Sequence, residues 1–358
     1  MNITVVGVGN AGSTIAADLT NKGHQVTLLK TSNKLHNEHY EKLKQTKSIF
    51  VKDYYIGNYI ANIFLVTEDV ELAISSADVI IIYIQTNYHR SIIKKIAPFI
   101  KDNQVIIFEP GYLSTCYLLQ ECDKDIVCIE AESSPIDCRI TSPCECEVLF
   151  KNVLNPFGVY PKHKKNFAEQ VLTNLGYPFR FTHNVIEAAL HNPNLIVHTI
   201  GAIFSIPRIE YTKGEYWMYK EVFSPHVWNI CEKLDDEKIA ILNAVGVKYS
   251  QRYVEAAQER NFVNDNREPI ESFFDYAYNS SPKGPSVPDS RYITEDVSQG
   301  LVLLESLGKV LNISTNVCTA LIDIANAALM IDFRAEGRTV ETLGKENIEK
   351  IISDGSEV

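Results

Sequence analysis

A glycine-rich turn near the N-terminus constrains this chain more than any other feature. The apolar, β-branched run at residues 3–6 predicts a buried parallel strand. It leads into Gly7-Val8-Gly9-Asn10-Ala11-Gly12, then into helical spacing over residues 13–22 and a second strand-like run. A G-x-G-x-x-G pattern alone is weak evidence. Between a strand and a helix, within about thirty residues, it indicates a dinucleotide-binding βαβ unit.

Each position of this turn has a mechanical role. Gly7 permits the tight turn, Gly9 lets the backbone approach a pyrophosphate, and Gly12 lets helix and strand pack closely. The pyrophosphate would then lie at the positive N-terminus of the helix, beside Asn10 and Ala11. We therefore expect these five residues to bind the cofactor.

The end of the second strand bears on which dinucleotide is used. NAD-selective sites usually place an acidic residue there, about twenty residues beyond the glycines, to bind the ribose 2′-hydroxyl. This chain has Lys30 at that position, followed by Thr31 and Ser32. A cation beside two hydroxyls suits a 2′-phosphate, because it supplies charge-assisted donors and no carboxylate. The pattern favours NADP, with NAD as the alternative if Lys30 is only a solvated loop residue.

Composition narrows the class of protein. With 358 residues the chain is long enough for two domains, and its net charge of −11 argues against a nucleic-acid partner. It contains no run of eighteen apolar residues, so we expect no membrane span. Because a strand is predicted at the very start, we expect no signal peptide. The eight scattered cysteines fit reduced thiols in the cytoplasm, and Cys144-Glu-Cys146 lacks the second ligand pair of a metal site.

Strand signals dominate as far as Thr182 and then almost vanish. We therefore expect an α/β fold, with a doubly wound Rossmann domain over residues 1–182 and an all-α domain over residues 183–358 that carries the substrate and catalytic groups. Thr86 and Asn87 follow the most apolar strand. Because the carboxyl ends of parallel strands line the cofactor cleft, both are candidate neighbours of the nicotinamide. His89, on the next helix, is expected at the surface.

Two polar clusters stand out in the helical part. Asn194 and His198 are four residues apart, so on a helix they share one face. A histidine there suits acid/base catalysis, although a buried structural histidine is the alternative. In the second cluster, Thr294 is expected to cap a helix whose first turn contains Asp296, and Arg291 is well suited to bind a carboxylate through two parallel hydrogen bonds.

The second cluster carries a family resemblance. The run R-Y-I-T-E-D-V-x-x-G-L-V over residues 291–302 resembles the signature of the opine dehydrogenases. Residues 192–198 look like the family's N-P-N-x-I-x-H-P. Residues 130–139 are similar to its E-T-x-x-x-P-x-x-x-R, and residues 337–344 to its C-terminal G-R-T-x-x-x-L-G. Two positions depart from the family pattern, since Thr199 replaces the usual proline and Ser298 stands where proline is more frequent.

The resemblance implies a function. Opine dehydrogenases condense the amine of an amino acid with a 2-oxo acid and reduce the resulting imine with a nicotinamide. Carried over by position, it implies a catalytic pair of His198 and Asp296, with Arg291 binding a substrate carboxylate. Asn194 and Tyr292 are the further substrate-binding candidates.

Two rival functions remain open. One is a ketopantoate reductase-like 2-oxo acid reductase, although enzymes of that type generally use a lysine as the acid. The other is an NADPH-binding sensor without turnover, which would need none of the three catalytic candidates.

The sequence leaves the co-substrates and the assembly open. Aromatic residues in the helical part are consistent with packing as well as with recognition: Tyr211, Trp217, Tyr219, Phe273 and Tyr276. The apolar helices near residues 301–333 fit either a homodimer interface or the core of one domain.

Overall fold

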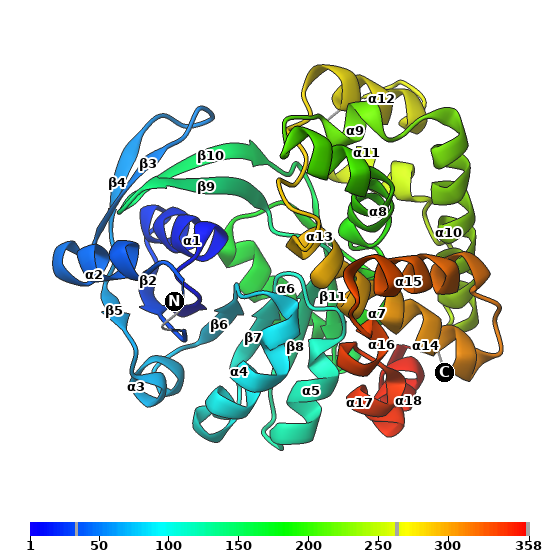
Figure 1. Ribbon diagram of the computed structural model, residues 1–358. Coiled ribbons are helices and arrows are strands. Elements are labelled where there is room, and N and C mark those ends of the chain that lie inside the picture. The colour runs from blue at the N-terminus through cyan, green and yellow to red at the C-terminus, as the bar shows by residue number, and fades with distance from the viewer. Residues whose placement is uncertain (33–34, 262–264, 356–358) are drawn as a thin grey trace. The chain divides into compact units, whose positions relative to one another are not determined.

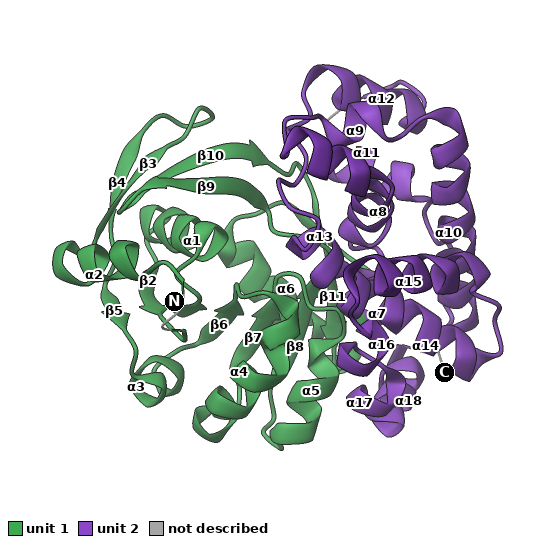
Figure 2. Ribbon diagram, viewed as in Figure 1, with its two compact units in different colours: residues 1–185 green, residues 186–358 purple. Residues whose placement is uncertain are grey.

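The strand-rich and helical parts of the chain form separate units. The computed structural model describes residues 1–32, 35–261 and 265–355. The chain divides into Met1–Val185 and Ile186–Val358, coloured green and purple in Figure 2. The division falls at residue 185, whereas the change of composition suggested residue 182. The α/β fold with a helical second part is confirmed.

An eight-stranded sheet forms the centre of the first unit, in the order β12-β11-β8-β7-β6-β1-β2-β5. All neighbouring strands pair in parallel except β11, which runs antiparallel to β8. Its strands are β1 (Asn2–Val6), β2 (Gln25–Leu29), β5 (Leu65–Thr67), β6 (Val79–Ile82), β7 (Val105–Phe108), β8 (Val127–Ala131), β11 (Asn155–Tyr160) and β12 (Phe179–Phe181). The residues of β6, β7 and β8 are buried on both faces, which explains their unbroken apolar runs.

Helices connect these strands. They are α1 (Asn10–Asn21), α2 (Asn37–Thr46), α3 (Val70–Ser75), α4 (His89–Ile96), α5 (Ser114–Glu121) and α6 (Lys165–Leu175), with short 3₁₀ turns η1 (Thr86–Tyr88), η2 (Ala97–Phe99) and η3 (Lys162–Lys164). Helix α5 was not expected, because residues 114–118 are all buried and so lack the apolar periodicity of a surface helix.

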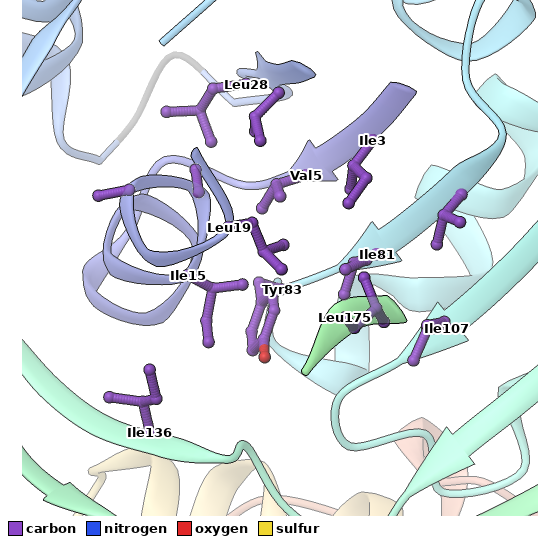
Figure 3. Packing of buried hydrophobic residues seen from close by; sticks show 14 of the residues in the cluster. Ile3, Val5, Ile15, Leu19, Leu28, Ile81, Tyr83, Ile107, Ile136 and Leu175 are labelled. Carbon is purple, nitrogen blue, oxygen red and sulfur yellow. The ribbon is translucent and has the colours of Figure 1, made fainter. Parts of the chain in front are cut away.

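A second sheet of four strands covers α1 (Figure 1). Its order is β4-β3-β10-β9, from β3 (Ser48–Lys52), β4 (Tyr59–Asn62), β9 (Ile136–Ser142) and β10 (Glu145–Lys151). β3 and β4 form a hairpin of neighbouring segments, whereas the parallel pairing of β3 with β10 joins distant segments and left no local signal. Ile15 and Leu19 of α1 lie in one apolar cluster with Ile136 of β9 (Figure 3).

The second unit is built from helices: α7 (Val185–Leu190), α8 (Asn194–Thr212), α9 (Met218–Glu221), α10 (Pro225–Ala244), α11 (Tyr253–Asn261), α12 (Pro269–Asn279), α13 (Arg291–Thr294), a π turn η4 (Val297–Leu301), α14 (Val302–Leu311), α15 (Asn316–Leu329), α16 (Phe333–Glu336), α17 (Val340–Leu343) and α18 (Lys345–Gly355). The apolar residues of α14 are largely buried within the chain itself, and so are Cys318, Leu321, Ile322 and Ala325 of α15, so they form the interior of this unit.

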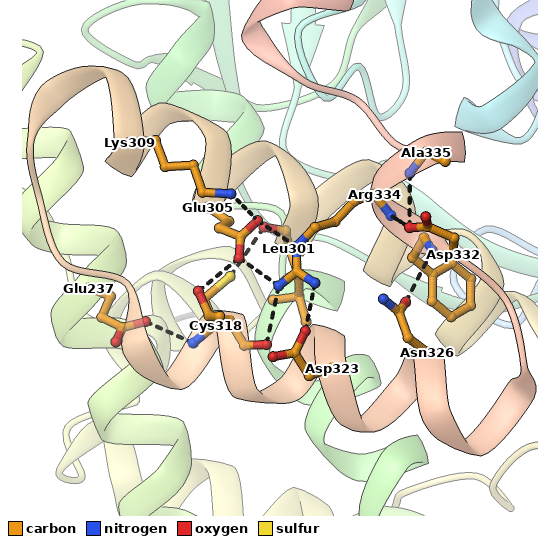
Figure 4. Close-up of polar contacts among 12 residues, drawn as sticks. Glu237, Leu301, Glu305, Lys309, Cys318, Asp323, Asn326, Asp332, Arg334 and Ala335 are labelled. Atoms are coloured by element: carbon orange, nitrogen blue, oxygen red, sulfur yellow. Dashed lines mark hydrogen bonds and ion pairs between the residues drawn. The ribbon is translucent and has the colours of Figure 1, made fainter.

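An ion-pair network around the buried Glu305 joins α14, α15 and α16 (Figure 4). The Glu305 carboxylate accepts hydrogen bonds from Arg334 Nε at 2.8 Å and Nη2 at 2.7 Å, from Lys309 Nζ at 2.9 Å and from Thr319 Oγ1 at 2.8 Å. The bonds from Arg334 are the main reason that the pKa of Glu305 falls to about 2. Glu305 therefore stays ionised at neutral pH.

Among the described residues, no single helix is long and apolar enough to cross a membrane. The segments Asn316–Leu329 and Phe333–Leu343 reach the length and apolar composition of a membrane span only when they are taken together, and the chain bends by 105° between them.

Candidate active site

The turn between β1 and α1 is so tightly packed that two of its positions accept only glycine. Gly7 has a φ of +118°, and a Cβ on it would overlap the Tyr83 carbonyl group. A Cβ on Gly12 would overlap the Gly7 carbonyl oxygen. A Cβ on Gly9 would instead meet the His36 ring, at 3.4 Å from Nε2. Gly7 and Gly12 therefore shape the turn itself, whereas Gly9 leaves its surface open for close approach.

The N-terminus of α1 fits a pyrophosphate. The helix starts at Asn10, and neither a side-chain cap nor an acidic residue occupies its first turn in the described structure. Its first N–H groups are thus directed at the glycine turn, as anion binding requires. The Asn10 side chain has another task, because its Oδ1 accepts the Ile140 N–H of β9 at 2.8 Å. Ala11 is half-buried against the core. Both residues thus present backbone rather than side-chain groups to the turn.

Lys30 lies at the end of β2, but its charge is directed into the protein. Its side chain is only 4% exposed, and Nζ donates to Asn37 Oδ1 at 2.5 Å and to the Leu35 carbonyl at 3.3 Å. Thr31 and Ser32 follow it, half-buried and exposed respectively. The contacts of Lys30 hold the start of α2, which the strand-end pattern could not reveal.

The segment after β6 contains the two expected cofactor neighbours, Thr86 and Asn87, and His89, whose burial differs from the expectation. Thr86 is buried and Asn87 is exposed, in η1. His89, expected at the surface, is fully buried. Its Nδ1 lies 2.6 Å from Ser114 Oγ and its Nε2 lies 3.1 Å from the Ile84 carbonyl oxygen. Because both ring nitrogens have partners, burial costs this histidine little, and it links the start of α4 to α5.

Two buried glutamates lie near the carboxyl ends of the neighbouring strands β7 and β8. Glu109 comes directly after β7, and burial raises its pKa to about 8, although the hydrogen bond from Tyr83 Oη opposes the rise. Glu130, in β8, accepts the N–H groups of Leu113 and Thr115, each at 2.8 Å. It thereby caps α5 with a negative charge at the helix N-terminus. Glu130 was noticed only through the family resemblance, because a side chain that caps a helix seventeen residues earlier has no local pattern.

The second unit brings His198 and Asp296 together. His198, on α8, is 7% exposed, and Asp296, just after α13, is 2% exposed. His198 Nδ1 lies 2.9 Å from Asp296 Oδ2. Tyr292 stacks on the imidazole, with ring centroids 3.7 Å apart and planes within 4°. The imidazole is therefore held on one edge by a carboxylate and on one face by a phenol ring.

The helix that carries these groups begins earlier than expected. Arg291 is its first residue, with Ser290 at the N-cap, so Thr294 is not a cap. The Thr294 hydroxyl instead donates back to the Ser290 carbonyl at 3.1 Å. A short polar side chain can bond locally in either position, and sequence alone did not distinguish the two. Arg291 is exposed on the same turn.

A cavity of about 130 Å³ adjoins the α8 turn below His198. Asn194 and Val197 contribute to its lining from α8, and four aromatic side chains line it as well: Tyr219, Tyr253, Phe273 and Tyr276. Buried Arg260 also lines it. Asn194 begins α8, and its N–H is capped by Asn192 Oδ1 at 3.0 Å. Tyr211 and Trp217 lie at the surface.

Within the described ranges, no three or more histidine, cysteine, aspartate or glutamate side chains are grouped as metal ligands. None of the eight cysteines forms a disulfide there.

Comparison with known proteins agrees with this arrangement. The model of the NAD/NADP octopine/nopaline dehydrogenase α-helical domain matches residues 181–329. The model of the NAD-dependent glycerol-3-phosphate dehydrogenase N-terminus matches residues 2–111. An opine dehydrogenase of Arthrobacter sp. (strain 1C) is 29% identical over 95% of this chain and 94% of its own length. The helical part of the chain thus matches the octopine/nopaline dehydrogenase model, and nearly the whole chain is similar to an opine dehydrogenase. The chain is an NAD(P)-dependent oxidoreductase.

Solved structures of opine dehydrogenases share its fold. An octopine dehydrogenase in complex with NADH and agmatine superimposes with a TM-score of 0.78 at 16% identity, covering 100% of this chain and 99% of that one. A yersinopine dehydrogenase with NADP⁺ bound gives a TM-score of 0.74 at 14% identity, covering 99% of this chain and 98% of that one.

Proposed function

We propose that this protein condenses the amino group of an amino acid with the carbonyl of a 2-oxo acid and reduces the resulting imine to a secondary amine. The reverse oxidation uses the same groups. The observation that carries the proposal is the hydrogen-bonded pair of His198 and Asp296 beneath Tyr292, in a unit that matches the octopine/nopaline dehydrogenase helical domain.

His198 is the proposed acid/base. Because Asp296 accepts the hydrogen bond from Nδ1, the ring keeps Nε2 for proton exchange with the substrate oxygen or nitrogen. Asp296 also stabilises the imidazolium that forms when Nε2 takes a proton. Tyr292 restricts the ring to one plane, so the exchanging nitrogen keeps a fixed direction. We propose that Tyr292 acts on the substrate through the imidazole, which modifies its expected role as a direct ligand.

Arg291 is the proposed ligand of a substrate carboxylate. Both co-substrates carry a carboxylate, while the protein has a net charge of −11, so attraction must come from local cations. A guanidinium can hold a carboxylate through two parallel hydrogen bonds and so fix the direction of the imine carbon. Its exposure, one residue before Tyr292, suits a group that meets substrate.

A nicotinamide dinucleotide supplies the hydride when it is bound. The glycine turn and the uncapped N-terminus of α1 fit its pyrophosphate, with Gly7, Gly9 and Gly12 and the backbone of Asn10 and Ala11 as the proposed contacts. We propose NADP(H) as the preferred cofactor and NAD(H) as the alternative. Thr31 and Ser32 remain the proposed 2′-phosphate contacts, whereas Lys30, whose Nζ bonds to Asn37 and Leu35, would contribute through its charge alone. Thr86 and Asn87 remain the proposed nicotinamide side.

The cavity beside Asn194 is the proposed site for the amino-acid side chain. Asn194 and His198 lie one helical turn apart, about 6 Å along the axis. An apolar cavity of about 150 Å³ in another protein holds benzene. The cavity of about 130 Å³ therefore suits a branched aliphatic or single-ring side chain better than an indole.

The decisive experiment measures NADPH and NADH oxidation with pyruvate, 2-oxoglutarate and glyoxylate, each with and without amino acids. We expect oxidation to require both an oxo acid and an amine. Oxidation by an oxo acid alone would place the protein among the hydroxy-acid reductases. Binding of NADPH without oxidation under any combination would indicate a sensor. Phenylalanine, leucine and tryptophan in the amine pool test the cavity assignment.

Cellular location and assembly are separate proposals. The eight cysteines without disulfides support a cytoplasmic location. A homodimer remains a proposal for sedimentation measurements, and exposed Ile324 of α15, with Met330 directly after it, is the apolar surface that this helix would offer to a partner.

A further inference from the structure

The helix that presents Asp296 is irregular at the next residue. Between α13 and α14, residues Val297–Leu301 form the π turn η4, in which the Val302 N–H bonds to the Val297 carbonyl five residues back. A π turn contains one residue more than an α turn and is frequently found at functional sites. Removing that residue would rotate the preceding segment by about 100° relative to α14. The direction of the Asp296 side chain therefore depends on η4.

A continuous chain of hydrogen bonds holds this turn. Arg338 Nε donates to Gln299 Oε1 at 3.0 Å, and Gln299 Nε2 donates to Ser298 Oγ at 3.0 Å. The Ser298 hydroxyl donates to the Thr294 carbonyl at 2.8 Å and lies 3.2 Å from the Glu295 carbonyl. These are the two residues directly before Asp296.

The backbone before α17 also meets η4. The Arg338 N–H donates to the Ser298 carbonyl at 2.9 Å. Gly337 lies so close that a Cβ would be 2.7 Å from the same oxygen. Arg338 has 0% exposure, and Gln299 and Ser298 are buried with it. A carbonyl displaced from the regular helical ladder thus receives a donor from a segment forty residues later.

We propose that Ser298, Gln299 and Arg338 are positioning residues for catalysis, which fix the π turn and thereby hold Asp296 against His198. The family signature more often has proline at position 298. Proline interrupts a regular helix because it lacks an N–H, whereas Ser298 keeps its N–H and its hydroxyl donates to the Thr294 carbonyl, a contact that can bend a helix. This assignment rests on the proposed catalytic role of His198 and Asp296.

The test compares Gln299→Met and Ser298→Ala with Ser298→Thr, which keeps the hydroxyl. We expect Gln299→Met to lower kcat about 10- to 100-fold, because small displacements of catalytic groups have effects of this size. The KM values of both co-substrates should change less than twofold. The alkaline limb of the kcat profile for imine reduction should move to lower pH, because the imidazolium loses part of its carboxylate support. Ser298→Ala should show a smaller loss of kcat and a smaller shift of the pH profile in the same direction. Ser298→Thr should keep the activity and the pH profile of the wild type.

Glu305→Gln is the matched control, because it weakens a polar network of the same unit without touching Ser298, Gln299 or Arg338. It should lower Tm without moving the pH profile. The positioning role is wrong if Gln299→Met behaves like Glu305→Gln at equal loss of Tm.

A second readout does not depend on the reaction. The downfield ring N–H proton that an Asp-bonded histidine gives in NMR should be present in the wild type and in Ser298→Thr, and broadened or lost in Gln299→Met. Failure of the proposed reaction would leave this result intact, whereas an unchanged resonance in Gln299→Met would overturn the positioning role alone.

Discussion

The proposed cofactor site of the first unit and the proposed catalytic site of the second unit, called here the backbone half and the side-chain half, are constructed in different ways. The first unit prepares its site with backbone, since Gly7 and Gly12 exclude any side chain and α1 offers its N–H groups. The second unit prepares its site with side chains, in which Asp296, Tyr292 and the η4 network each fix a neighbour. A backbone site depends on the absence of atoms at a few positions, whereas a side-chain site depends on the correct atoms at many. The two should therefore fail differently when altered.

The largest effect is expected from the side-chain half. Asp296→Asn should lower kcat by about 10²- to 10⁴-fold, because the amide neither stabilises imidazolium nor selects the same tautomer. NADPH binding, measured by fluorescence titration, should stay within twofold. Asp323→Asn is a suitable control, since this exposed carboxylate on α15 accepts a hydrogen bond from Arg334 (Figure 4). A full loss of NADPH affinity in Asp296→Asn would show that the two halves are not separable in this way.

The backbone half should separate folding from binding. Gly12→Ala forces a Cβ into the Gly7 carbonyl and should destabilise the first unit by about 3 kcal/mol, at the upper end for overpacking. Gly9→Ala meets only the edge of the His36 ring, so stability should hardly change. Its methyl group would stand where the pyrophosphate approaches, and the Kd for NADPH should rise about tenfold or more. Urea unfolding and cofactor titration of both variants would test this, and equal stability losses would contradict it.

Buried glutamates extend the contrast between the units. Glu305 lies among cations, and its pKa of about 2 is below the ordinary value of about 4.3. Its contribution to stability is therefore present above about pH 4.3 and is lost as the pH falls toward 2. Glu305→Gln should lower the free energy of unfolding at pH 7 by about 2 kcal/mol, reduced from the value for a fully buried pair because Arg334 is partly exposed. The difference from wild type should shrink in urea titrations at progressively lower pH.

Glu109 should show the opposite dependence on pH. Its pKa of about 8 means that the folded protein keeps a proton which the unfolded chain releases above about pH 4.3. Stability should therefore fall as the pH rises from about 4.3 to 8, with a slope of at most about 1.4 kcal/mol per pH unit. Glu109→Gln is neutral throughout and should remove this part of the slope. If the slopes of wild type and variant coincide between pH 5 and 8, Glu109 is ionised in the folded state.

The same contrast explains what the sequence could predict. The glycine spacing and the apolar strands predicted the Rossmann half, because backbone constraints leave local patterns. His198 and Asp296 were paired only by resemblance, since residues 98 positions apart share no periodicity. The second sheet, the Glu130 cap and the η4 network were not foreseen for the same reason. Thr294 and His89 were misplaced because capping geometry and burial of a single polar side chain depend on partners elsewhere in the chain.

The helices that line the cavity are mostly not those that carry the proposed proton-transfer groups, and this affects how substrate specificity can change. The groups assigned to proton transfer come from α8 and α13, whereas most of the aromatic wall comes from α9, α11 and α12. Only α8 contributes to both. Replacements at Tyr219, Tyr253 or Tyr276 can thus alter which amine is accepted while leaving the proton-transfer groups in place. This division of labour offers gene duplication, or a laboratory library, a route to new opines through wall residues alone.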